Sequence, residues 1–108
     1  MDTHETLLRS KDGDTEAFRA LVDHYQGYAL RLAHRLLNDP DDARDAVQDA
    51  FVRVWKHLPG FDPRARFTTW LYRIVTNICY DRLKADRRRA RAMEAGAREP
   101  DPPGTSDP

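Results

Sequence analysis

The sequence predicts an all-α protein, a compact bundle of three to four helices with a disordered Pro-rich C-terminal tail. Two observations support this fold class. Apolar residues recur at steps of three and four along most of residues 4–92, and no segment shows the sustained alternation of a strand. Residues 93–108 are instead rich in Pro, Gly, Ser and acidic side chains, a composition that buries too little apolar surface to fold.

The first part of the chain predicts a short helix followed by a long helical stretch. The short helix spans His4 to Lys11 and ends at Gly13, and Asp14 is a suitable N-cap for the stretch that follows. Gly27 lies inside this stretch and should kink or divide it, and we expect two helices. The apolar positions of the stretch are Phe18, Leu21, Val22, Tyr25, Tyr28, Ala29, Leu32, Ala33, Leu36 and Leu37.

In the middle of the chain the sequence predicts the end of one helix directly followed by the start of the next. Asn38 suits a helix C-terminus, Asp39 an N-cap and Pro40 the first helical position. The helix that follows is predicted from Asp41 to His57, and the dipeptide Pro59-Gly60 ends it. Its expected buried stripe consists of Ala43, Ala46, Val47, Ala50, Phe51, Val54, Trp55 and Leu58.

The last part of the chain predicts a connector, residues 61–67, and one long helix. Thr68 is the expected N-cap of this helix. Its expected buried side consists of Leu71, Ile74, Val75, Ile78 and Leu83.

Length, charge and cysteine content limit the possible classes of protein. The 108 residues provide for one domain, and the formal net charge is zero. The charges are nevertheless unevenly distributed along the chain. Residues 61–92 carry nine Lys and Arg against three Asp and Glu, whereas residues 1–60 carry eight Lys and Arg against eleven Asp and Glu. The asymmetry indicates a basic surface for phosphates and an acidic surface for a cationic partner. With a single cysteine, Cys79, and no apolar run of about 18 residues, we expect a soluble cytoplasmic protein without membrane insertion.

The helix predicted at 41–57 carries a second stripe, opposite its apolar one. Most such stripes are solvated faces, and spacing alone favours that reading here. Val52, an exposed β-branched residue among acids, favours instead a contact with a partner helix that presents arginines. The stripe consists of Asp45, Gln48, Asp49, Val52 and Lys56, with Asp41 and Asp42 at the helix start.

The last helix combines amide, hydroxyl, aromatic and cationic side chains away from its core stripe. Single-stranded nucleic acid needs rings on which bases stack, polar groups for base edges and cations for phosphates. A basic run such as ADRRRARA is weak evidence alone, but after this face it predicts a clamp on phosphates. The face consists of Thr69, Arg73, Thr76, Asn77, Tyr80, Lys84, Arg87 and Arg88, with Trp70 and Tyr72 nearby.

Resemblance to a known family rests on three segments in this order: DTEAFRALVDHYQ, DDARDAVQDAFVRVW and FTTWLYRIVTNICYDRLK. Together they resemble the core-binding and promoter-melting domain of a bacterial RNA polymerase sigma factor, of the extracytoplasmic-function (ECF) group of the sigma-70 family. The resemblance covers roughly residues 10–92. It implies a region 2-like helical domain over residues 1–92, followed by a flexible interdomain linker at 93–108.

The resemblance also implies two partners and the residues that contact them. The acidic helix is expected to dock on a coiled coil of the largest subunit of core RNA polymerase through Asp41, Asp42, Asp45, Gln48, Asp49, Val52 and Lys56. The connector and last helix are expected to bind the −10 promoter element as it opens, capturing flipped bases of the non-template strand. This second set is Phe61, Asp62, Arg64, Arg66, Phe67, Thr69, Trp70, Tyr72, Arg73, Thr76, Asn77 and Tyr80, with Lys84, Arg87 and Arg88 as the phosphate clamp.

The chain departs from the family in length. Full members carry a second helical domain that reads the −35 element, whereas this chain stops in a Pro-rich segment where the linker should lie. We therefore expect either a shortened chain or one half of a longer protein. Members of the group are commonly held inactive by anti-sigma proteins, and such an inhibitor would cover the acidic helix, the DNA face or both.

Three other functions are compatible with parts of the sequence. An enzyme is disfavoured because His4, His24, His34 and His57 belong to no metal or nucleophile motif, so we expect no metal, no cofactor and no catalytic residue. A pure protein-interaction module sequestered by an anti-sigma factor is the second. A double-strand DNA-binding regulator with a recognition helix is the third, and the aromatic content argues against it.

Overall fold

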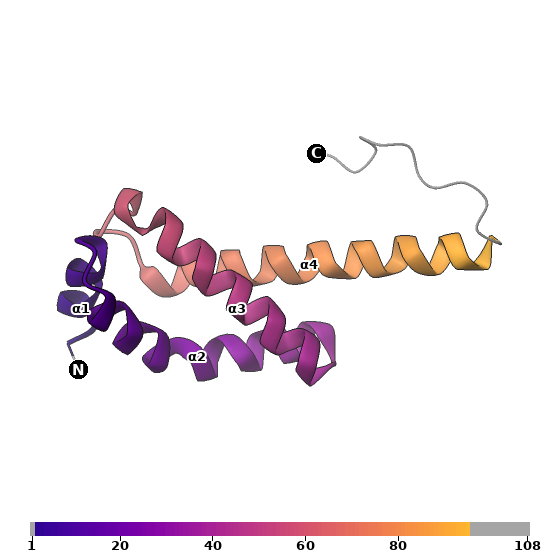
Figure 1. The fold of residues 1–108 in the computed structure, drawn as a ribbon, viewed down its shortest axis with the longest axis horizontal. Helices are drawn as coiled ribbons and strands as arrows, with labels where there is room; N and C mark the ends of the chain where they lie inside the picture. Colours follow the sequence, from indigo (N-terminus) through magenta and orange to yellow (C-terminus); the bar gives the residue numbers. More distant parts are fainter. Residues whose placement is uncertain (1, 96–108) are drawn as a thin grey trace.

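The computed structural model describes residues 2–95, which form four α-helices and one short 3-10 helix. The order is α1 (Thr3–Lys11), α2 (Thr15–Leu37), α3 (Pro40–His57), η1 (Leu58–Gly60) and α4 (Phe67–Glu94) (Figure 1). No strand occurs among these residues, and the predicted all-α class is confirmed. The predicted tail lies outside the described residues beyond residue 95, and its expected start at 93 falls inside α4.

The predicted caps at the helix boundaries are confirmed. The Asp14 carboxylate accepts from the N–H groups of Glu16 and Ala17, and Asp39 caps α3 in the same way. Asn38 adopts the left-handed conformation, with φ of 56°, and its N–H donates to a carbonyl in the last turn of α2. These local hydrogen bonds fix where each helix begins and ends.

The expected break at Gly27 is wrong, because α2 is one continuous helix from Thr15 to Leu37. Gly27 lies on the exposed side of the helix, while Leu21 and Ala33 on either side of it are fully buried. Burial of flanking residues on one stripe favours a single rod, and it outweighs a glycine penalty of about 1 kcal/mol.

Thr68 was expected to cap the last helix, and this is also wrong. The helix begins at Phe67, and its N-cap residue, two residues before Thr68, is Arg66, which makes no side-chain cap hydrogen bond. The buried Phe67 ring packs against Tyr25, at a centroid distance of 5.0 Å, and against Trp70, at 5.8 Å. Tertiary packing of this ring, rather than a capping side chain, therefore sets the start of α4.

The core lies where α2, α3 and the first half of α4 pack on one another, and α1 covers one end of α2 (Figure 1). The C-terminal half of α4 projects beyond the other helices. On α4 the predicted positions Leu71, Val75 and Ile78 are buried, whereas Ile74 and Leu83 are half-buried. The largest fully buried side chains are Leu21, Val54, Leu58, Leu71, Val75 and Cys79.

Replacing either of two glycines in the N-terminal half by alanine should change the free energy of unfolding, and the two changes should have opposite signs. A Cβ at Gly27 would meet only the guanidinium end of Arg31, at 3.3 Å, which can move aside. We expect Gly27→Ala to raise the free energy of unfolding by about 0.5–1 kcal/mol. Gly13 has φ of +94°, a conformation that alanine rarely adopts, so Gly13→Ala should lower the free energy of unfolding. Urea unfolding monitored by circular dichroism measures both, and a destabilised Gly27→Ala variant would contradict the account of α2.

Candidate functional site

Four aromatic rings gather where the connector meets α4. Phe61 stacks on Trp70 with ring centroids 4.5 Å apart and an interplanar angle of 22°. Phe67 meets Phe61 edge to face at 6.1 Å and lies between Trp70 and Tyr25. Phe61 and Phe67 are only 8% and 6% exposed, whereas Trp70 is half-buried. The cluster thus ties the connector to the first turns of α4 and leaves Trp70 partly exposed.

An open hollow of about 770 Å³, here called the connector depression, lies beside this cluster. Gly60 stands at its rim without a side chain, and the stacked rings of Phe61 and Trp70 form part of its wall. Such a volume lies within the range of small-ligand sites. The lining residues are His57, Gly60, Phe61, Asp62, Ala65, Arg66, Thr69, Trp70 and Arg73.

The connector is held by its own hydrogen bonds. The Asp62 carboxylate accepts from the Arg64 backbone N–H at 2.9 Å and from the Arg64 Nε at 3.1 Å. The Ala65 N–H donates to the Asp62 carbonyl at 2.9 Å. Hydrogen bonds from the Arg64 side chain and backbone lower the pKa of Asp62, so the carboxylate is ionised at neutral pH. Two of the residues expected on DNA therefore pair with each other, with the Arg64 side chain 90% exposed.

The exposed side of α4 continues from the connector depression, because Thr69 and Arg73 belong to both. We call this surface the outer face of α4. The Tyr72 and Tyr80 side chains are 48% and 52% exposed. Lys84 and Arg87 are exposed farther along, on the half of α4 that projects from the body, and Arg88 is half-buried. The exposed members of the predicted DNA set on this face are Thr69, Tyr72, Arg73, Asn77, Tyr80, Lys84 and Arg87.

Three members of the predicted DNA set are buried instead. Phe61 and Phe67 belong to the aromatic cluster, and Thr76 is 7% exposed. The Thr76 hydroxyl lies 2.8 Å from the Tyr72 carbonyl oxygen, to which it donates, and 3.2 Å from that of Arg73. Buried rings offer no free face to a base, and a hydroxyl that donates inside the helix has no proton for one. These side chains shape the depression and support its neighbours.

The acidic stripe on α3 is solvent-facing, as the spacing predicts: Asp45, Gln48, Asp49 and Lys56 are exposed, and Val52 is 51% exposed. Two of the acids expected to contact polymerase already have partners. Asp49 forms an ion pair with Arg82 of α4, 3.0 Å apart, and Asp41 pairs with Arg44. Asp42, at the start of the helix, is half-buried. Within residues 2–95, Asp45 has no cation within ion-pairing distance.

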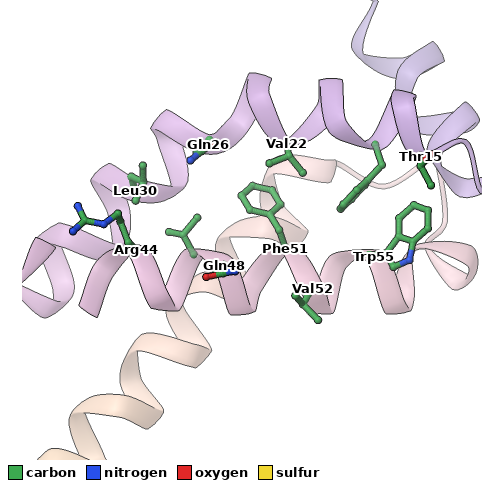
Figure 2. Close-up of a pocket in the computed structure, with 11 residues that line it drawn as sticks. Thr15, Val22, Gln26, Leu30, Arg44, Gln48, Phe51, Val52 and Trp55 are labelled. Atoms are coloured by element: carbon green, nitrogen blue, oxygen red, sulfur yellow. The ribbon is translucent and has the colours of Figure 1, made fainter. Parts of the chain in front are cut away.

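Sequence reasoning missed an apolar groove beside this stripe, here called the α2–α3 groove, with a volume of about 600 Å³ (Figure 2). Val47 and Phe51 are its most buried lining residues, and Phe18 packs on Trp55 with ring centroids 4.8 Å apart. Trp55 was expected in the core, but it is 37% exposed. The lining residues are Thr15, Phe18, Val22, Gln26, Leu30, Arg44, Val47, Gln48, Phe51, Val52 and Trp55.

A signal for this groove was present in the sequence. α2 has more apolar positions than one core stripe requires, since Phe18, Val22 and Leu30 follow a line distinct from the buried Leu21, Ala29 and Leu32. A second apolar line on an amphipathic helix indicates either a second packing partner inside the protein or a binding surface. In the described part of the chain it lines an open groove.

Residues 2–95 contain no group of three or more His, Cys, Asp or Glu side chains arranged to hold a metal ion. The four histidines are all exposed. Cys79 is buried, and burial raises the pKa of its thiol, which disfavours the reactive thiolate. None of the helices in this part of the chain is long and apolar enough to cross a bilayer.

Comparison with known proteins relates this geometry to a family. The family model for sigma-70 region 2 matches residues 21–89. The ECF RNA polymerase sigma factor SigW of Bacillus subtilis is 40% identical over 78 residues, which are 72% of this chain and 42% of the relative. The ECF RNA polymerase sigma-E factor of Escherichia coli is 36% identical over 98 residues, 90% of this chain and 51% of the relative. The chain thus spans about half or less of the length of these relatives.

Two solved structures are similar in fold and sequence. An engineered region 2 of sigmaE, in complex with GTAAAA, superposes with a TM-score of 0.77 at 36% identity, covering 82% of this chain and 93% of that one. CnrH in complex with the cytosolic domain of CnrY gives a TM-score of 0.65 at 34% identity, covering 79% of this chain and 60% of that one. The family model covers more than half of the residues, and the relatives are named as ECF sigma factors, so this chain belongs to the sigma-70 region 2 family, in its ECF group.

Proposed function

We propose that this domain recognises and melts the −10 promoter element and, through a second surface, binds core RNA polymerase, so that transcription can begin. One observation carries the DNA half of the proposal. The connector depression opens directly onto the outer face of α4, which presents polar, aromatic and cationic side chains in succession. Further support comes from the engineered region 2 of sigmaE, whose structure contains GTAAAA.

Base capture in the connector depression would offset part of the cost of opening the duplex. Extracting one base costs on the order of a few kcal/mol in lost stacking and pairing. A stacking contact with an aromatic side chain returns roughly 1–3 kcal/mol per base. Trp70 at the wall and the exposed rings of Tyr72 and Tyr80 supply such surfaces. Asn77, exposed on the same helix, has both a donor and an acceptor for a base edge.

Phosphates of the captured strand would lie along cations that are available to them. Among the described residues, Arg66, Arg73, Lys84 and Arg87 have no carboxylate within ion-pairing distance. Arg66 and Arg73 line the depression, while Lys84 and Arg87 continue along α4. Arg88 completes the proposed clamp. Because these contacts neutralise phosphates, binding should weaken steeply with salt.

The polymerase half of the proposal places a partner helix in the α2–α3 groove. Apolar side chains of the partner would fill the space over Phe51 and Val52, and its arginines would meet Asp45 at the edge. The resemblance to the family leads us to expect a coiled coil of the largest polymerase subunit as this partner. The groove and the connector depression share no residue, so both partners can bind together.

An anti-sigma protein is the second proposed partner. CnrH, similar in structure, is known in complex with the cytosolic domain of CnrY. An inhibitor that occupies the α2–α3 groove would compete with polymerase, and one that covers the outer face of α4 would compete with DNA. The activity proposed here is binding coupled to strand separation, with no bond made or broken, and it would take place in the cytoplasm, where polymerase works.

Strand preference tests the melting proposal. We expect the domain, alone or in holoenzyme with core polymerase, to bind a non-template single strand more tightly than the same sequence as duplex, because rings can stack only on unpaired bases. The first oligonucleotide to test is GTAAAA, and others are selected from a pool randomised over the −10 positions. Fluorescence anisotropy measures the affinity for each sequence as a single strand and as a duplex. Tighter binding to duplex would show instead a double-strand reader.

Polymerase docking is tested by Val52→Asp and Asp45→Lys. Each should weaken binding to core polymerase by about 2 kcal/mol or more, because one puts a charge into an apolar contact and the other reverses an attractive one. Asp45 is a cleaner choice than Asp49, whose replacement would also break the ion pair with Arg82.

The matched control for Asp45→Lys is Asp23→Lys, an exposed acid on α2 outside the groove. Binding to core polymerase is measured by biolayer interferometry, and single-strand binding by the free domain should stay unchanged in all three variants. Full polymerase affinity in both Val52→Asp and Asp45→Lys would refute the docking surface.

A further inference from the structure

Lys11, the last residue of α1, lies in neither site described above, yet it reaches the connector. Its Nζ donates to the carbonyl oxygens of Leu58 at 3.3 Å, Pro59 at 2.9 Å and Phe61 at 2.7 Å. An ammonium group has three protons, so every donor of Lys11 is used on backbone that lies 47 to 50 residues away in sequence. No other hydrogen bond of a side chain in residues 2–95 spans as many residues.

The three acceptors are backbone carbonyls of η1 and of the first connector residue, directly after the end of α3. α3 ends at His57, and the carbonyl of its C-cap residue, Leu58, already accepts from the Phe61 N–H at 3.0 Å, so Lys11 adds a second hydrogen bond there. An ammonium on three such oxygens forms charge-assisted hydrogen bonds, which are shorter and stronger than neutral ones. Lys11 is half-buried, so its contacts are less screened by water than those of a surface lysine.

The backbone of Lys11 stands on a fixed support. Immediately after α1 the chain turns into α2, and the Asp14 N–H donates to the Arg9 carbonyl at 3.1 Å. The Arg9 side chain also pairs with the Asp14 carboxylate at 2.9 Å, but this ion pair is partly exposed and adds little to the support. α1 in turn packs along α2. The ammonium group is thereby held at a defined place relative to the helical body, rather than following the connector wherever it moves.

The shortest of the three bonds acts on the residue that forms the wall of the depression. The Phe61 carbonyl accepts it, and the Phe61 ring stacks on Trp70. The next residue, Asp62, also lines the depression and begins the hydrogen-bonded turn with Arg64. Any displacement of the Phe61 backbone therefore moves both the ring and the turn.

We propose that Lys11 is a positioning residue for base recognition: it fixes the connector from the far side, so that α1 controls base selectivity without touching DNA. The inference rests on the proposed function, since it presumes that the connector depression holds a base. It also implies that the depression is shaped before DNA arrives, because all of the contacts named lie within the free protein.

The test compares Lys11→Met with Arg9→Met. The methionine keeps the apolar stem of Lys11 and removes all three donors, while Arg9→Met removes the same charge two residues earlier in the same helix, away from the connector. For each protein, affinities are measured for a single strand selected from the randomised −10 pool and for the same strand altered at its most strongly preferred position. The ratio of the two affinities is the selectivity.

We expect Lys11→Met to reduce this ratio by roughly fivefold or more, the lower end of what one well-placed contact contributes to base discrimination. Arg9→Met should keep the wild-type ratio. Equal weakening on both strands would reduce Lys11 to a charge that attracts phosphates. Unchanged affinity for both strands would leave it as a purely structural residue. Either result overturns the proposal. Absence of any preference in the wild-type protein would instead overturn the proposed function.

A second measurement needs no DNA. In a Trp55→Phe background Trp70 is the remaining tryptophan, and its quenching by acrylamide reports how well Phe61 covers it. We expect faster quenching in Lys11→Met and no change in Arg9→Met, and equal quenching in both would overturn the proposal. Should Lys11→Met fail to fold, Lys11→Gln, which keeps an amide donor at shorter reach, is measured in the same two ways with the same criteria.

Discussion

The stack of Phe61 on Trp70 is the interaction on which the proposed DNA site depends. It joins a connector without regular structure to the first turns of α4, and ring pairs of this kind contribute about 0.5–1.5 kcal/mol beyond the burial of their surface. Phe67 and Tyr25 close the cluster on the inside. Because Gly60 leaves the rim open, the result is a depression with an aromatic wall rather than a closed core.

α3 belongs to both proposed sites. One side of it lines the α2–α3 groove, and its C-terminal end leads through η1 into the connector. The ion pair of Asp49 with Arg82 joins α3 to α4. A charged residue that looks available in a sequence is thus engaged within the fold, whereas Asp45, one turn earlier, faces solvent without such a partner among residues 2–95. The same helical body thus carries two separate surfaces.

Helix caps could be predicted from the sequence, whereas features that depend on packing between helices could not. Asp14, Asn38 and Asp39 were assigned correctly because a cap depends on its own neighbours in sequence. The continuous helix through Gly27 and the start of α4 at Phe67 depend on burial against other helices, which outweighs local preference. The α2–α3 groove requires the relative placement of two helices, and the contacts of the α1 lysine use backbone carbonyls, which no pattern of side chains reveals.

The two tryptophans test the central claim most directly, because one lies in each proposed site. Trp70 lines the connector depression and Trp55 lines the α2–α3 groove. An NMR titration of the 15N-labelled domain with a −10 non-template strand follows both indole N–H signals at once. The account predicts that the Trp70 signal shifts and saturates while the Trp55 signal stays in place. A shift of Trp55 alone, or of neither signal at saturating strand, would contradict it.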